Sequence, residues 1–143
     1  MKLSHLDDAI ALLEKANIDL EPELLSTDAA REFLDRYARA KKLAAFGETA
    51  LMRKVDDAGE IARVTGTSIG KAKATVETAK TLRDAETVSE AFAGGELSLD
   101  QASEIARAEQ AKPGAAKELL TVAKEQSFQV LREKSRKVVL EAE

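Results

Sequence analysis

The sequence predicts an all-α fold, and three observations carry that prediction. Apolar residues recur three and four apart along most of the 143 residues, which is the spacing of one face of a helix. Aromatic residues make up only 3% of the chain, so the core must come mainly from Ala, Leu, Val and Ile, and Ala and Leu favour helices. Ser, Gly and Pro interrupt the apolar pattern at the positions where helices are expected to begin or end. We therefore expect a single compact multi-helix domain over residues 1–143, with about seven or eight helices, one long helix and a helix-turn-helix-like hairpin.

The first 58 residues predict two helices separated by a connector. Apolar residues at helical spacing indicate a helix over residues 4–17, and residues 18–27, which contain a proline, predict a connector with one short turn. A second stripe predicts one long helix over residues 28–58, with Gly47 on its apolar face. Glycine inside a helix costs about 0.5 to 1 kcal/mol relative to alanine. Either a neighbouring helix crosses closely at Gly47 or the helix kinks there, and the small flanking residues favour the crossing.

The middle of the chain predicts three shorter helices. The first covers about residues 57–65 and ends at Gly66, which should adopt the left-handed conformation. The second starts at Ser68, and four of its residues have the spacing of an inward stripe: Ile69, Ala72, Val76 and Ala79. The third starts at Asp84 and is closed by two glycines, with three apolar residues facing inward: Val88, Ala91 and Phe92.

The last third of the chain predicts three more helices. Ser98 and Gln101 have the spacing of a capping box, in which each side chain satisfies a free backbone N–H, and this places a helix over residues 99–111. Pro113 begins the next helix and Ser127 caps the last one. That last helix is still amphipathic where the chain stops, so we expect a piece of a longer protein. Its apolar residues are candidates for packing against a second copy or a nuclease domain: Val130, Leu131, Val138 and Leu140.

The amino-acid composition excludes several kinds of functional site and several classes of protein. The chain has no Cys, which excludes disulfides, thiolate metal sites and cysteine nucleophiles. No stretch approaches the roughly 18 apolar residues that span a bilayer, and no secretory segment is visible, so we expect a soluble cytoplasmic domain with no membrane partner. The net charge of -4 is unevenly spread, because residues 61–83 hold five basic residues against one acidic residue. A local basic face is therefore compatible with an acidic chain.

Three small residues have the spacing of a DNA-binding helix-turn-helix: Ala62, Gly66 and Ala72. Two helices that meet steeply need a small residue at their contact and a left-handed residue between them. The second helix would then present its first turn to the major groove of double-stranded DNA. The candidate DNA-binding residues are Thr67, Ser68, Lys71, Lys73, Thr75, Lys80 and Arg83. A purely structural hairpin is the commoner reason for such spacing, and Glu77 stands where it can pair with either flanking lysine, so both interpretations stay open.

The most specific string of the chain is GGELSLDQASEI at residues 94–105. Together with the Thr65-Gly66-Thr67-Ser68 turn, it resembles the actinobacterial 13E12-repeat family, also called DUF222, over about residues 28–139. In that family a helical domain typically precedes an HNH nuclease domain. The resemblance implies a non-catalytic helical module of an HNH-endonuclease-like protein. Many members carry a Trp in the helix before the Thr-Gly turn, and this chain has no Trp.

Nothing in the sequence has the pattern of a catalytic site. An HNH nuclease needs several His, Asn or Asp residues around a divalent metal, and this chain has one histidine, His5, so the HNH motif is absent. Adjacent acids such as Asp7-Asp8 diverge by about 100° on a helix and cannot converge on one ion. We expect no catalytic residue, metal, cofactor or small-molecule substrate. The alternative to DNA contact is a protein–protein interaction or dimerisation module with no nucleic-acid binding.

Overall fold

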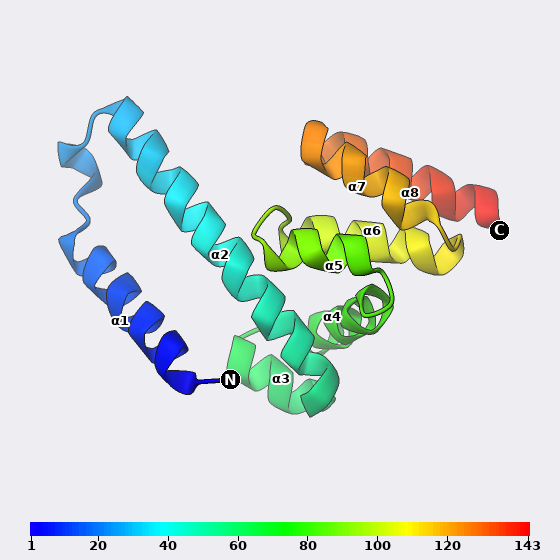
Figure 1. Ribbon diagram of the computed structural model, residues 1–143, viewed down its shortest axis with the longest axis horizontal. Helices are drawn as coiled ribbons and strands as arrows, with labels where there is room; N and C mark the ends of the chain where they lie inside the picture. Colours follow the sequence, from blue (N-terminus) through cyan, green and yellow to red (C-terminus); the bar gives the residue numbers. More distant parts are fainter. The chain divides into compact units, whose positions relative to one another are not determined.

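The computed structural model describes residues 1–143 and confirms the all-α class, with eight α-helices, one 3₁₀ turn and no strand (Figure 1). The long helix is α2, with 29 residues. The elements in chain order are α1 (Leu3–Asp19), η1 (Pro22–Leu24), α2 (Thr27–Val55), α3 (Ala58–Thr65), α4 (Ile69–Leu82), α5 (Glu86–Ala93), α6 (Leu99–Ala111), α7 (Ala115–Glu125) and α8 (Phe128–Ala142). The predicted boundaries agree with these elements to within a few residues.

The chain divides into two compact units, which we call the N-terminal unit (residues 1–36) and the C-terminal unit (residues 37–143). The N-terminal unit contains α1, the predicted connector with its single turn η1, and the first residues of α2. Ser26 begins α2, because its side-chain oxygen accepts the backbone N–H of Ala29 at 3.1 Å. The long helix α2 then continues into the C-terminal unit.

The hydrophobic core of the C-terminal unit is built around α6, which packs against α4, α5, α7 and α8. The capping box predicted for α6 is present, because Ser98 accepts the N–H of Gln101 and the Gln101 side chain accepts the N–H of Ser98. Several large apolar side chains are fully buried: Val88, Phe92, Leu97, Ile105 and Leu131. The inward residues predicted for α5 are thus correct.

Helix α2 is held on this core by an aromatic pair and a glycine. Phe46 meets Phe92 edge to face, with ring centroids 5.6 Å apart. Gly95 has a φ of +79°, and a Cβ there would lie 3.1 Å from the Leu43 side chain, so glycine allows α2 to approach the loop before α6. The close crossing predicted at Gly47 is wrong, because a Cβ at Gly47 would meet no atom within 4 Å. The close approach of α2 occurs over Gly95 instead.

The last helix, α8, uses most of its apolar stripe inside the C-terminal unit. Leu131 is fully buried, and Val130 and Val138 pack half-buried against the same core. The buried Ser135 donates a hydrogen bond to the Glu104 carbonyl of α6 at 2.8 Å. Only Leu140 of the four residues predicted to meet a partner is strongly exposed. Leu131 is therefore unavailable to a second copy or a nuclease domain, and Val130 and Val138 are only partly available.

Candidate nucleic-acid interface

The predicted hairpin is formed by α3, a turn at Gly66 and α4. Gly66 has a φ of +71°, and its N–H donates to the Ala62 carbonyl at 2.9 Å, which closes α3. Ser68 begins α4 by accepting the N–H of Lys71 at 3.0 Å. Ala62 is buried together with Ala72 and Val76, and the two helices change direction at the turn (Figure 1). The small-residue contact predicted from the Ala-Gly-Ala spacing is therefore present.

Two residues of α4 face the opposite way from the prediction. Thr75 was predicted to contact DNA, but it is 5% exposed and its hydroxyl donates to the Lys71 carbonyl at 2.8 Å. Ile69 was predicted to face inward, but it is 54% exposed because it lies in the first turn, before the buried stripe begins. The reason is that α4 packs against three helices, α3, α5 and α6, so its buried face is wider than one narrow stripe. Thr75 falls within that wide face and is unavailable to DNA.

The remaining predicted residues lie in three different places. Lys71 lines a groove near the start of α4, whereas Lys73 and Lys80 line a separate cavity with Asp56. Lys80 forms ion pairs with Asp56 and Glu77, both at 3.8 Å. These pairs are solvent-exposed and contribute little stability, but they place acidic charge beside one predicted phosphate contact. The lysines of α4 therefore do not form one continuous face.

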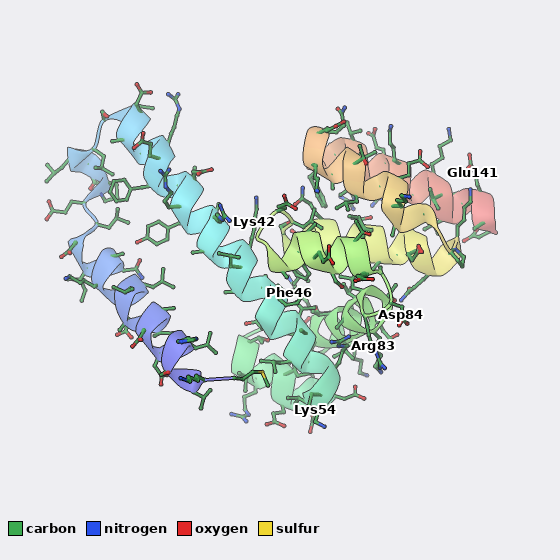
Figure 2. The ribbon with its side chains drawn as sticks, viewed as in Figure 1. Lys42, Phe46, Lys54, Arg83, Asp84 and Glu141 are labelled. Atoms are coloured by element: carbon green, nitrogen blue, oxygen red, sulfur yellow. The ribbon has the colours of Figure 1, made fainter.

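Arg83, the last predicted residue, lies at the end of α4 (Figure 2). It lines a pocket of about 260 Å³ together with Arg53 of α2. The Thr49 hydroxyl, which also lines this pocket, is buried and has no hydrogen-bond partner. Arg83 is thus associated with α2 and α5, away from the first turn of α4.

The groove at Lys71 collects basic side chains from two helices. It has a volume of about 550 Å³ and is lined by α2, by the turn between α3 and α4, and by the start of α6. We call Lys41, Lys42 and Lys71, which all line it, the groove lysines. None of the three forms an ion pair. Lys42 projects from the middle of α2 (Figure 2).

Two helix starts open into the same groove. Thr67 lines it immediately before α4, and Ser98 and Leu99 line it at the beginning of α6. The first turn of a helix has free N–H groups and a partial positive charge, so it favours an anion. Two carboxylates, Glu48 and Asp100, also line the groove and reduce its charge. Three lysines and two helix starts still leave this region suited to a phosphate.

Lys41 and Lys42 were not among the residues predicted from the sequence. Both lie on α2, outside the segment that matched the helix-turn-helix spacing. The available signal was the basic stretch that begins with Arg36 and Arg39 and ends at Lys42. A linear charge pattern indicates such a stretch, but only the docking of α2 over Gly95 brings it beside Lys71.

No three His, Cys, Asp or Glu side chains are grouped so that they could hold a metal ion. None of the helices combines the length and apolar character needed to cross a bilayer. Comparisons with known protein families, with curated proteins and with solved structures found no match to this chain. The resemblance to the 13E12-repeat family therefore stays a prediction from the sequence.

Proposed function

We propose that this chain is a non-catalytic helical module of an HNH-endonuclease-like protein, and that its groove lysines contact the phosphate backbone of double-stranded DNA. The observation that carries the proposal is the convergence of Lys41, Lys42 and Lys71 on one groove without an acidic partner for any of them. Unpaired lysines beside helix N-termini are the groups that proteins use to hold phosphates.

The side chains at the start of α4 favour contact with the DNA phosphate backbone over recognition of the base sequence. Reading base edges requires free side chains on the first turns of the second helix. Here Ser68 caps α4, the Thr67 hydroxyl lies 2.9 Å from that of Thr65, and Thr75 is buried. We therefore expect affinity that depends little on DNA sequence and strongly on salt.

The place of this module in a larger protein rests on the resemblance of residues 94–105 to the 13E12-repeat family. On that basis the catalytic step belongs to an HNH domain that this chain does not contain, and the helical module positions DNA for it. We therefore propose no catalytic role for this chain itself.

The test is a salt titration of binding to a fluorescent duplex of about 25 base pairs, measured by anisotropy. Each phosphate contact adds about -0.9 to the slope of log affinity against log salt, so three groove lysines give a slope of about -3. Lys42→Ala/Lys71→Ala should bring the slope to about -1 and weaken binding on all sequences alike. The matched control is Lys73→Ala/Lys117→Ala, which removes the same charge from exposed lysines outside the groove.

The control variant should keep the slope of the unmodified protein, and both variants should keep its circular dichroism. Equal losses in the two double variants would mean that general attraction, not the groove, holds the DNA. Absence of binding by the unmodified protein at about 50 mM salt, where phosphate contacts are strongest, would contradict the proposal altogether.

A further inference from the structure

The N-terminal unit leaves the apolar face of α1 uncovered. Leu3, Leu6, Ile10 and Leu13 follow each other at intervals of three and four residues, so they lie along one face of the helix. They are 78%, 58%, 53% and 41% exposed, and no residue of α1 is buried. A stripe of this kind normally packs against another helix.

The start of α2, in the same unit, also has exposed apolar side chains. Phe33 and Leu34 are 48% and 69% exposed, although they are large apolar residues on the stripe of that helix. A helix of 17 residues such as α1 is only marginally stable alone in water, and packing of its apolar face supplies most of its stability. The N-terminal unit therefore has two amphipathic helices and no core.

We propose that a second copy of this chain covers these stripes, and that the two N-terminal units together form a four-helix bundle. The stripe of α1 also includes Ala9 and Ala16, so it is wider than the contact strip between two paired helices. Within one chain α1 does not pack along α2, so neither helix covers the stripe of the other. Two N-terminal units brought together can give each helix two neighbours and enclose both stripes in one core.

The exposed area matches what a dimer requires. Covering a Leu, Ile or Phe side chain removes on the order of 100 Å² of apolar surface from water. The six large residues of the two stripes therefore offer about 600 Å², and their alanines and the stems of flanking charged residues add more. A stable protein interface covers about 800 Å² on each partner. Monomers rarely expose a continuous apolar patch larger than a few hundred Å².

Charge favours a second copy over nucleic acid as the occupant. The N-terminal unit has nine acidic and four basic residues, a net charge of -5, so it repels phosphate. All of these charges lie off the α1 stripe, which contains only Leu, Ile and Ala. The stripes of two copies therefore do not repel each other. The like charges of the outer faces should weaken the dimer at low salt, and screening should tighten it as salt rises.

The test measures the mass of the full chain by light scattering and by sedimentation, at protein concentrations from about 1 to about 100 μM. We expect a species of twice 15.4 kDa that dissociates on dilution and is tighter at higher salt. Leu6→Gln/Leu13→Gln should raise the dissociation constant at least about 100-fold, because each substitution acts in both copies. Glutamine has nearly the helix propensity of leucine, so the helix content of the monomer is kept.

The matched control is Leu12→Gln, which changes an adjacent leucine that is 68% exposed but lies off the stripe, and it should shift the dissociation constant less than about threefold. Because the chain has no Cys, copies labelled at Lys15→Cys with a donor or an acceptor should show energy transfer on mixing. A monomer at every concentration would overturn the proposal, whether α1 is then free or folded onto the rest of its own chain. A dimer that survives Leu6→Gln/Leu13→Gln would overturn it too. None of these results depends on whether the groove lysines bind DNA.

Discussion

The two units of this molecule differ in how far their apolar side chains are buried, because every buried apolar residue lies in the C-terminal unit. Leu97 and Leu131 in the C-terminal unit are 0% exposed, whereas every leucine of α1 is at least 41% exposed. The units also differ in charge, since the N-terminal unit carries -5 and the C-terminal unit, with 18 basic and 17 acidic residues, carries +1. An amphipathic sequence thus predicts that a helix forms, but it does not predict what covers the helix.

We propose separate tasks for the two units. The C-terminal unit contains its own core and the groove lysines, so it is the unit that we propose to contact DNA. The N-terminal unit is acidic and has no core, so we propose that it joins two copies. Salt should act in opposite directions on the two contacts, because it competes with phosphate binding and screens repulsion between acidic helices.

The largest expected effect comes from removing leucine side chains in each unit. Leu97→Ala should lower the free energy of unfolding by about 2 to 5 kcal/mol, because it leaves a cavity in a packed core. Leu12→Ala should change it by less than about 0.5 kcal/mol, because Leu12 is exposed and lies off the stripe. Urea unfolding followed by circular dichroism measures both. Equal losses would mean that α1 belongs to the same cooperative core as α6.

A smaller effect should come from the serine caps. Ser98→Ala removes half of the capping box of α6, the central helix of the core, and should cost about 1 kcal/mol in global stability. Ser26→Ala removes the corresponding cap of α2 in the N-terminal unit, and at concentrations where the chain is monomeric it should fray the helix start with little effect on the main transition. Thermal unfolding of the two variants side by side gives the comparison. A larger loss at Ser26 would reverse our ranking of the two units.

The sequence predicted the elements of the fold because their signals are local. The capping box at Ser98, the left-handed cap at Gly66 and the Ser127 cap each depend on residues within one helical turn, and each is present in the structure. The small contact residue Ala62 was also predictable, since it follows from the spacing across one turn.

The tertiary relations were less predictable because they depend on which helices become neighbours. Thr75 is buried because α6 packs beside α4, and Gly47 is open because α2 makes its close approach at Gly95. Lys42 meets Lys71 across a groove although the two residues are 29 positions apart in the chain. Periodicity within one helix does not specify these neighbours. It therefore gave part of the candidate site, Thr67 and Lys71, and missed the part that α2 contributes.

The most direct test of the difference between the units is hydrogen exchange of the full chain, read by mass spectrometry at low and at high protein concentration. We predict that amide exchange in α1 slows as protein concentration rises, because a second copy covers its stripe, while exchange in α6 stays the same. Exchange in α1 that is as slow as in α6 and independent of concentration would contradict dimerisation through α1, because α1 would then be stabilised within a single chain.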